Sequence, residues 1–338
     1  MIPRRFLVAP DAFKGTLSAR QVAAAIGRGL QTAGEPPPDL CPVADGGEGT
    51  LEVLLGARGG HRDTATVSDP LGRLVPADFG LIPDDGLAIV EVAAASGLTR
   101  VAAHERDPLV ASTRGTGELI LAAIAAGAAT VIVAAGGSAT TDGGLGAIEA
   151  IEAAGGLGCV RLVVCCDVRT PFEQAAARFA PQKGADPAAV RLLARRLDRL
   201  ARRWPRDPRG VAMSGAGGGL AGGLWARFGA QLQAGAPFVL DALSFDGRLR
   251  PARAVIVGEG RLDRSTLEGK AAAEIATRAR QIGVPAHAIV GCDALSRFDA
   301  RILDLQAIIE AGDEPALEAA AAALAQRLAD APIGARTR

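Results

Sequence analysis

The sequence predicts a two-domain α/β protein, and three observations support this fold class. The chain has 338 residues, more than one ordinary domain needs. Apolar residues make up 49% of it, enough for large cores. Several short apolar runs end in a loop with Gly or Asp, and most of them precede a segment with helical periodicity. Strands that alternate with helices indicate mostly parallel sheets covered on both faces.

The expected strands share a β-branched, apolar composition and are Phe6–Pro10, Leu40–Ala44, Val131–Ala135, Leu162–Cys166, Ala254–Val257 and Ala288–Val290. Acidic residues follow at or near the ends of five of them, namely Asp11, Asp45, Asp167, Glu259 and Asp293. Ligands of open parallel sheets bind beyond the carboxyl ends of the strands, so these carboxylates predict a site. For any one of them the alternative is a turn or helix cap, which Asp also favours.

Helix starts are marked by capping patterns. Ser18 with Gln21, and Ser265 with Glu268, are typical of capping boxes, and Asp186 before Pro187 is typical of an N-cap. The helix expected over about 187–204 is rich in arginine and favours a solvated basic face. The stretch Leu119–Gly137 carries no charge for 19 residues, but its composition favours helix, turn and strand over a membrane span.

Composition excludes several classes of function. The 37 basic and 37 acidic residues cancel, so no global field recruits nucleic acid or an anionic membrane. Three isolated histidines argue against a zinc site. Five scattered cysteines without a CxxC pair suit a reducing compartment, and the first residues lack the apolar run of a signal peptide. We therefore expect a cytoplasmic protein that binds neither nucleic acid nor membrane.

The lysines are the sharpest chemical signal. Arginine outnumbers lysine 34 to 3, and Lys14, Lys183 and Lys270 each adjoin a glycine. Lysine is a compact point charge that reaches an anion through a narrow gap, whereas arginine brings a broad planar fork. We interpret these three lysines as ligands of phosphate or carboxylate oxygens, and the alternative is three surface lysines retained by chance.

Glycine-rich loops are the second signal. The stretches 45–50 and 136–144 each follow a strand and open a helix, where backbone N–H groups can form an anion nest. A third loop, 214–219, is similar or serves only tight packing. Known nucleotide and hydrolase signatures are absent: the chain has no GxxxxGK[ST], no GxGxxG after its first strand and no GxSxG.

In this order the motifs resemble those of the bacterial class I glycerate kinases. The matching stretches are 9–15, 42–50, 69–73, 95–98, 115–119, 136–140, 181–184 and 258–263. Together they span nearly the whole chain, which makes the set more specific than any single loop.

The resemblance implies two α/β domains with the active site in the cleft between them. A flavodoxin/Rossmann-like parallel-sheet domain would comprise residues 1–64 and 285–338, and a larger inserted α/β domain would comprise 65–284. The implied activity is the phosphorylation of D-glycerate by ATP with Mg²⁺, most often at the 2-hydroxyl in this class. The partners would be a small hydroxy acid and a nucleotide, and the assembly a monomer or a homodimer.

Site residues are expected on the matching motifs. The catalytic set is Lys14, Asp45, Asp167 and Lys270, with the lysines neutralising charge and either aspartate acting as base or metal ligand. The metal set is Asp142, Glu259 and Asp263. Arg73, Arg261 or Lys183 would hold the carboxylate of glycerate. The expected substrate- and nucleotide-binding residues are Asp11, Gly46, Gly47, Glu48, Asp69, Arg73, Ser96, Thr116, Gly136, Gly137, Ser138, Thr140, Lys183, Gly258, Gly260 and Arg261.

The chain departs from the family pattern in three places. It has Thr141 where the family usually has Asn, the stretch between Gly144 and Cys165 is shorter than expected, and Gly291–Asp293 matches loosely. These departures leave other readings open. One is a kinase for another small hydroxy acid or a polyol, another is a non-catalytic binder of organic acids or sugar phosphates, and the last is a metal-dependent phosphatase or lyase.

Overall fold

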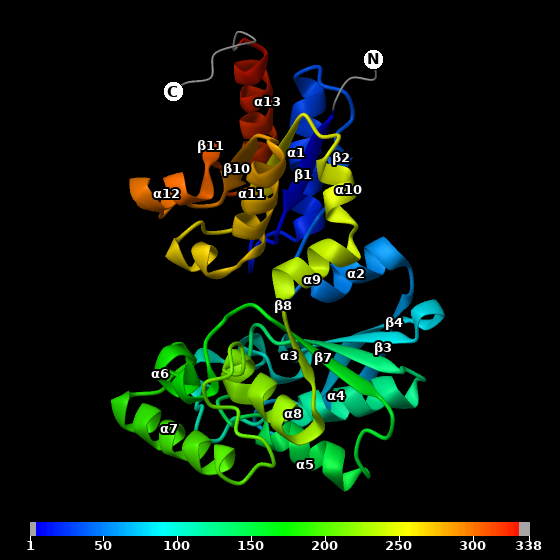
Figure 1. Ribbon diagram of the computed structural model, residues 1–338, viewed down its shortest axis with the longest axis vertical. Coiled ribbons are helices and arrows are strands. Elements are labelled where there is room, and N and C mark those ends of the chain that lie inside the picture. The colour runs from blue at the N-terminus through cyan, green and yellow to red at the C-terminus, as the bar shows by residue number, and fades with distance from the viewer. Residues whose placement is uncertain (1–4, 331–338) are drawn as a thin grey trace. The chain divides into compact units, whose positions relative to one another are not determined.

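The computed structural model describes residues 5–330, which form two compact α/β units (Figure 1). Unit 1 comprises the described residues up to Ala44 and from Leu240 onward, and unit 2 comprises Asp45–Val239. The boundaries therefore differ from the expected ones at residues 64 and 284. The reason is strand pairing, because β9 (Ala254–Gly258) lies beside β1 (Phe6–Pro10) in the sheet of unit 1.

Unit 1 has a flavodoxin-like sheet, as the fold class predicted. Its five strands are all parallel and follow the order β2-β1-β9-β10-β11, which is 2-1-3-4-5 by their sequence within the unit. Besides β1 and β9, the elements are α1 (Ala19–Thr32), β2 (Asp39–Leu40), α10 (Phe245–Leu249), α11 (Ala271–Ile282), β10 (Ala286–Val290), α12 (Arg297–Leu303), β11 (Leu305–Glu310) and α13 (Glu314–Asp330).

The core of unit 1 follows the alternation of its strands. Phe6 and Val8 of β1, with Ile256 of β9, point to one face of the sheet and pack with the apolar stripes of α1 and α13. The helix α11 packs against β9 and β10 without contributing to this core. Both faces of a parallel sheet are thus covered, which explains the uninterrupted apolar runs of its strands.

Unit 2 contains a mixed sheet of six strands in the order β3-β4-β5-β6-β7-β8. The pairs β3–β4 and β4–β5 are antiparallel, and β5 to β8 are parallel. Its elements are α2 (Thr50–Arg58), β3 (His61–Ser68), β4 (Leu74–Ile82), β5 (Leu87–Glu91), α3 (Val92–Ser96), α4 (Arg114–Ala125), β6 (Thr130–Ala134), α5 (Leu145–Ala153), β7 (Arg161–Cys166), α6 (Ala175–Phe179), α7 (Pro187–Ala201), α8 (Leu220–Phe228), β8 (Gln231–Ala234) and α9 (Gly235–Ala242), which ends beyond the boundary.

Unit 2 has two separate apolar clusters. The larger one joins the sheet with α4, α5 and α8. The smaller one is built around Phe172, Leu193 and Leu197 and joins α6 to α7. The segment that carries Phe179 and Lys183 therefore rests on a small core of its own.

The predicted helix starts are confirmed at two of three places. Ser18 forms a full capping box with Gln21, and Asp186 caps α7. The box predicted at Ser265 is wrong, because Asp263 caps the short turn Arg264–Glu268 instead. Asp263 takes this role because its side chain accepts from the backbone N–H of Ser265.

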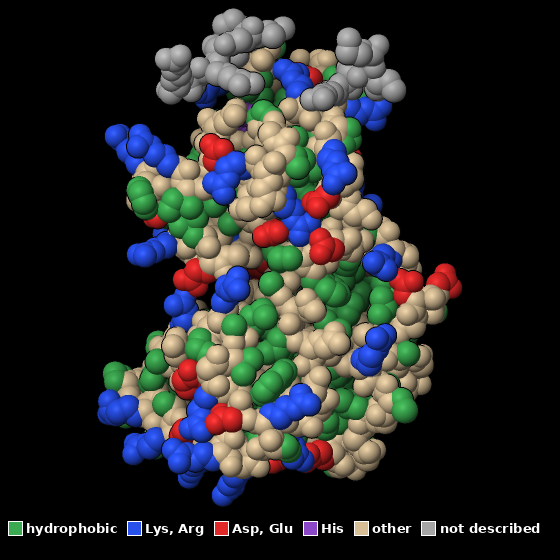
Figure 2. Space-filling view, in the orientation of Figure 1, with side chains coloured by type: hydrophobic (Ala, Val, Ile, Leu, Met, Phe, Trp, Pro, Cys, Tyr) green, Lys and Arg blue, Asp and Glu red, His purple; other side chains and the backbone are tan. Residues whose placement is uncertain are grey.

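The charge-free stretch forms the C-terminal part of α4, a turn at Gly127 and the strand β6, as predicted. No helix in residues 5–330 is long and apolar enough to cross a membrane. The arginines of α7 lie on its solvent side, where Figure 2 shows a gathering of basic side chains. Arg202 is paired with Asp198, while Arg191, Arg195 and Arg199 are exposed.

Candidate active site

Unit 1 brings predicted residues together at the ends of its two central strands. β1 and β9 are neighbours at the point where the strand order reverses, and Asp11 and Glu259 directly follow them. The backbone N–H of Asp11 donates to the carbonyl of Gly258 at 2.8 Å, which holds the two loops together. A side chain on Gly260 would begin 3.3 Å from the Cα of Phe13, so this glycine permits close approach. In flavodoxin-like sheets ligands bind at this switch point.

Glu259 is the buried centre of this group. Its carboxylate lies 3.5 Å from the Nζ of Lys270 and accepts a hydrogen bond from the hydroxyl of Thr266. Thr266 also accepts from the backbone N–H of Asp263, so its hydroxyl links the Glu259 carboxylate to the backbone of the Asp263 turn. Hydrogen bonds from Ser265 are the main cause of the lowered pKa of Asp263. Three of the predicted residues thus form one polar cluster.

Two more predicted cations lie on the loops that follow β1 and β9 and are exposed. Arg261 Nε lies 3.5 Å from a carboxylate oxygen of Asp263. Lys14 is exposed on the loop that packs against Gly260. Both cations are on the solvent side of loops that follow β1 and β9, where an incoming anion can reach them.

In unit 2 the first glycine loop, 45–50, is occupied by the protein itself. Glu91, at the end of β5, accepts from the backbone N–H groups of Gly49 and Leu51, both at 2.9 Å. Gly47 N–H donates to the carboxylate of Asp45. Burial raises the pKa of Glu91, against the effect of the two N–H groups. A carboxylate at the start of α2 repels another anion, which argues against the anion nest predicted here.

Gly46 and Gly47 serve close packing within unit 2. A side chain on Gly46 would begin 2.6 Å from the Cα of Gly235, and one on Gly136 would begin 2.7 Å from the Cα of Gly47. The two predicted glycine loops therefore touch each other. Glu48 is exposed at the tip of the first loop.

The second glycine loop is open where the first is closed. Among the described residues, no hydrogen bond is donated by the backbone N–H groups of Gly136, Gly137 and Ser138. The loop is held from its other side, because Leu98 N–H donates to Gly137 O and Ala139 N–H donates to Ser96 O. Three successive N–H groups thus remain available to a ligand.

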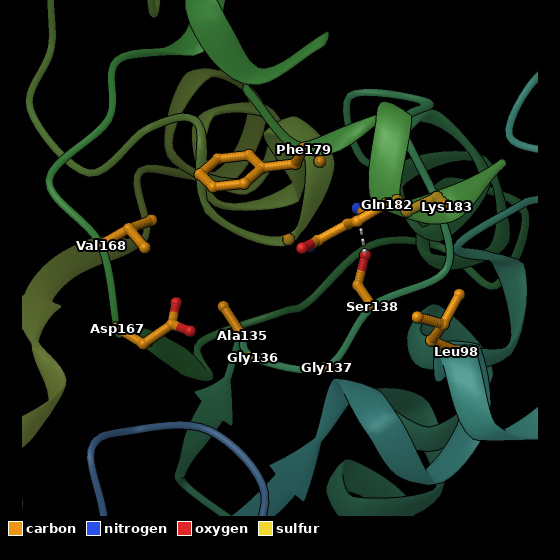
Figure 3. Close-up of a pocket in the computed structure, with 12 residues that line it drawn as sticks. Leu98, Ala135, Gly136, Gly137, Ser138, Asp167, Val168, Phe179, Gln182 and Lys183 are labelled. Atoms are coloured by element: carbon orange, nitrogen blue, oxygen red, sulfur yellow. Dashed lines mark hydrogen bonds between the residues drawn. The ribbon is translucent and has the colours of Figure 1, made fainter. Parts of the chain in front are cut away.

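These residues line a pocket of about 120 Å³ (Figure 3). Figure 3 shows the Asp167 carboxylate on one side and Ser138 with Lys183 on the other, with the ring of Phe179 above them. The whole lining comes from unit 2 and comprises Leu98, Ala135, Gly136, Gly137, Ser138, Asp167, Val168, Phe179, Gln182, Lys183, Gly217 and Gly218. The pocket is too small for a whole nucleotide, since pockets for drug-sized ligands begin at roughly 300 Å³.

Lys183 is buried at the edge of this pocket. Its ammonium donates to the carbonyl of Thr140 at 2.5 Å and to the hydroxyl of Ser138 at 3.2 Å. Burial lowers its pKa to about 8, although Asp142 and Asp167 act in the opposite direction. An ammonium has three donors, so two protein partners leave one for a ligand. Lysine without a carboxylate partner in hydrogen-bond reach suits the binding of an anion.

The third glycine loop, 214–219, both lines the pocket and allows tight packing, the two roles considered for it from the sequence. Gly217 and Gly218 line the pocket. Gly218 also has a φ of +70°, and a side chain there would begin 1.9 Å from the carbonyl oxygen of Thr140. The same carbonyl accepts from Lys183, so Gly218 lets the loop approach the group that positions the lysine.

Four predicted binding residues lie away from this pocket and contact other groups of unit 2. Asp69 accepts from Arg73 Nε at 2.6 Å and from two backbone N–H groups, and Arg73 also contacts Glu105. This network stabilises the turn between β3 and β4. Ser96 and Thr116 are fully buried and bond to each other at 2.8 Å. None of the four lines the pocket.

Asp142 is also corrected, because its carboxylate is fully used inside unit 2. It accepts from the N–H and hydroxyl of Thr113 and from the N–H groups of Gly144 and Gly146. These bonds fix the first turns of α4 and α5, which gives Asp142 a structural role. Within residues 5–330, no cluster of three or more His, Cys, Asp or Glu side chains is arranged to hold a metal.

Several pocket residues had not been identified from the sequence. Leu98 lies at the end of a matching motif and Gln182 lies inside another, but neither carries a charge that suggests a role. The only sequence signal for Phe179 is that it is aromatic, in a chain where 3% of the residues are aromatic.

The chain has Thr141 where the family usually has Asn, and the hydroxyl of Thr141 is buried without a hydrogen-bond partner in the described part of the chain.

A flavodoxin-like sheet with a carboxylate–lysine cluster, and a second sheet with a small cationic pocket, define an α/β enzyme that acts on a small anionic substrate. Comparison with known proteins identifies the family to which this enzyme belongs. The model of the glycerate kinase family matches residues 6–156 and 152–332. The two matched ranges meet at residues 152–156, within the stretch between Gly144 and Cys165 that is shorter than the family pattern predicts.

Among curated relatives, glycerate 2-kinase of Escherichia coli K12 is 37% identical over 326 residues, 85% of each chain. Glycerate kinase of Bacillus subtilis 168 is 38% identical over 327 residues, again 85% of each chain. A crystal structure from Salmonella typhimurium LT2, assigned as glycerate kinase 2, has a TM-score of 0.78 and 35% identity, covering 96% of this chain and 98% of that one. The chain belongs to the glycerate kinase family, and it is an enzyme.

Proposed function

We propose that the protein transfers the γ-phosphoryl group of ATP to the 2-hydroxyl of D-glycerate and forms 2-phosphoglycerate and ADP. Membership of the glycerate kinase family supports the reaction, and the name of the E. coli relative supports the 2-position. The single structural observation that carries the proposal is the pocket of about 120 Å³ with a cation and a carboxylate in its lining. That size suits a small acid.

In this reaction the hydroxyl oxygen of glycerate forms a bond to the γ-phosphorus while the bond from phosphorus to the β–γ bridging oxygen breaks. The hydroxyl proton needs an acceptor, and we assign this role to Asp167. Asp167 lines the pocket, whereas Asp45 is buried and accepts from Gly47 N–H. A positioned carboxylate base contributes roughly 10²- to 10⁴-fold to the rate of such a step.

Lys14 and Lys270 are proposed to neutralise the phosphates of the nucleotide. Both roles are proposed because the loops that carry these lysines follow β1 and β9, the two strands at the switch point of the sheet in unit 1. Lys270 is half-buried and lies 3.5 Å from Glu259, so its charge is already oriented. Phosphoryl transfer depends mainly on such positioning and charge stabilisation.

The residues of unit 1 fit a magnesium ion, which would supply positive charge to the phosphates during transfer. Magnesium is usually held by one or two carboxylates together with substrate phosphates and water. Glu259 and Asp263 supply two carboxylates in the loop that follows β9, with Thr266 bonded to the Glu259 carboxylate and to the Asp263 backbone, and they would hold the ion. Asp142 is not part of this set, for the reason given above.

A coupled assay of ADP release tests the proposal. The assay uses ATP, Mg²⁺ and a panel of small hydroxy acids and polyols that includes both enantiomers of glycerate. We expect turnover with D-glycerate, and NMR of the product to show phosphate on the 2-oxygen. Turnover with a different acid alone would reassign the substrate. Binding of D-glycerate without ADP formation would replace the kinase with a non-catalytic binder.

A further inference from the structure

The pocket of unit 2 has a polarity that matches one class of molecule. At one end are the ammonium of Lys183 and the unused backbone N–H groups of Gly137 and Ser138. At the other end is the carboxylate of Asp167, which accepts hydrogen bonds (Figure 3). A molecule with an anionic group at one end and a hydroxyl group at the other satisfies both ends.

Resting on the proposed function, we propose that this pocket is the hydroxy-acid subsite, in which Lys183 and the Gly137 and Ser138 amides hold the carboxylate and Asp167 accepts from the hydroxyl. The volume of about 120 Å³ suits a small acid better than a nucleotide base with its ribose. The two opposite charges of the lining favour a singly charged acid over a phosphate dianion, which Asp167 would repel.

Lys183 is preorganised for this role. Ser138 and Thr140 use two of its three donors and fix the ammonium before the acid arrives. The small apolar cluster of α6 and α7 carries the segment on which Lys183 lies. A buried, fixed donor loses little entropy on binding, so the contact contributes strongly to affinity.

Binding of the acid in this subsite is coupled to a proton. The titratable groups that face Lys183 are Asp142 and Asp167, and Arg106 packs against Gly184 behind it by its backbone. Burial holds the pKa of Lys183 at about 8 in the free protein, and a bound carboxylate raises it. At pH 8.5 about a quarter of the free protein is charged at Lys183, so binding takes up roughly 0.7 proton per acid.

Isothermal titration of the full chain tests this assignment. D-glycerate is titrated at pH 8.5 and pH 6.5 in buffers of different ionisation enthalpy, and the buffer dependence of the heat gives the number of protons. We expect roughly 0.7 proton taken up at pH 8.5 and almost none at pH 6.5. Glycerol, propionate, inorganic phosphate and ADP are titrated in parallel. Propionate should bind more weakly than D-glycerate with the same proton uptake, and glycerol should take up none.

Variants assign the two ends of the pocket. Lys183→Met should raise the KM for D-glycerate about 10- to 100-fold and abolish proton uptake, with the KM for ATP unchanged. Asp167→Asn should lower kcat at least 100-fold and keep the proton uptake. Ser138→Ala, which keeps the charge of Lys183, should change the KM only severalfold. Arg191→Met, on the exposed side of α7, is the matched control and should change nothing.

The pH dependence provides an independent measurement. In the wild type, kcat/KM for D-glycerate should fall above about pH 8 as Lys183 loses its proton, and Lys183→Met should remove this limb. Without ligand, Lys183 has a pKa of about 8 in the folded chain and the ordinary lysine pKa of 10.5 in the unfolded chain. Between these two pH values the unfolded chain therefore binds more protons than the folded one. The unfolding free energy of the wild type should therefore rise with pH across this window relative to Lys183→Met.

The outcomes separate the subsite from the reaction. Turnover of D-glycerate with an unchanged KM and unchanged proton uptake in Lys183→Met overturns the subsite and leaves the kinase intact. Proton uptake with D-glycerate but no ADP formation supports the subsite and overturns the kinase. Proton uptake with ADP or phosphate instead, lost in Lys183→Met, overturns the assignment in favour of a phosphate site.

Discussion

The two glycine loops of unit 2 look alike in the sequence and differ in the structure. Each is predicted from the sequence to follow a strand, contains paired glycines and precedes a helix, although in the structure β2 already ends at Leu40, before the first loop. In both, a carboxylate of the protein already occupies the first turn of the helix: Glu91 caps α2, and Asp142 caps α5. Neither helix start is free to bind an anion.

The difference lies upstream of the helix. In the first loop the N–H of Gly47 is used by Asp45, while in the second the N–H groups of Gly136–Ser138 face a pocket with Lys183. A glycine-rich strand–helix turn therefore indicates an anion site only where both the N–H groups and a cation remain available. The loop contributes the donors, and a lysine 45 residues away in the chain contributes the charge.

The largest effect is expected from Asp142→Ala, which removes the cap of the open loop. Four hydrogen bonds at the starts of α4 and α5 are lost, and buried N–H groups are left unpaired. We expect a loss of unfolding free energy on the order of 3–5 kcal/mol, measured by urea denaturation. Asp142→Asn, which keeps one acceptor oxygen, should recover part of it. If Asp142→Ala keeps full stability, the structural role of this carboxylate is wrong.

A smaller effect on stability, but a large one on activity, is expected from Gly136→Ala. The new methyl group would meet Gly47 Cα at 2.7 Å and displace the pocket loop. We expect kcat/KM for D-glycerate to fall at least 100-fold, or about 2.7 kcal/mol of transition-state stabilisation.

Gly49→Ala in the closed loop is the matched control. Its φ of +95° is costly for alanine, but nothing lies within 4 Å of the added carbon. It should lose about 1 kcal/mol of stability and keep its kinetic constants. Equal loss of activity in both variants would contradict the distinction between the loops.

Sequence patterns identified much of the fold and part of the site. Strand ends placed Asp11, Glu259 and Asp167 correctly beyond parallel strands, because apolar runs and the residues after them are local features. The rarity of lysine singled out Lys183 and Lys270, which both contact polar groups of their clusters. Domain boundaries were misjudged because they depend on which distant strand pairs with β1.

Other residues could not be assigned because their partners are remote in sequence. Asp69 and Arg73 form a turn network with Glu105, 32 residues beyond Arg73. Glu91 closes the first loop from 42 residues beyond Gly49. The sequence alone does not distinguish a carboxylate or cation that binds a ligand from one that bonds to another part of the protein. Only the three-dimensional hydrogen-bond partners separate these two roles.

A modest effect is expected from Glu91→Gln, which tests the closed loop directly. A glutamine can still accept from one of the two N–H groups of Gly49 and Leu51, so the structural loss should be about 1–2 kcal/mol. Removing a charge whose pKa is raised by burial offsets part of that loss at neutral pH, because the folded state then no longer holds a desolvated anion. The KM for D-glycerate should stay within twofold of the wild-type value. A Glu91→Gln protein that binds D-glycerate or phosphate more tightly at a second site would show that the charge of Glu91, and not packing, keeps the first loop closed to anions.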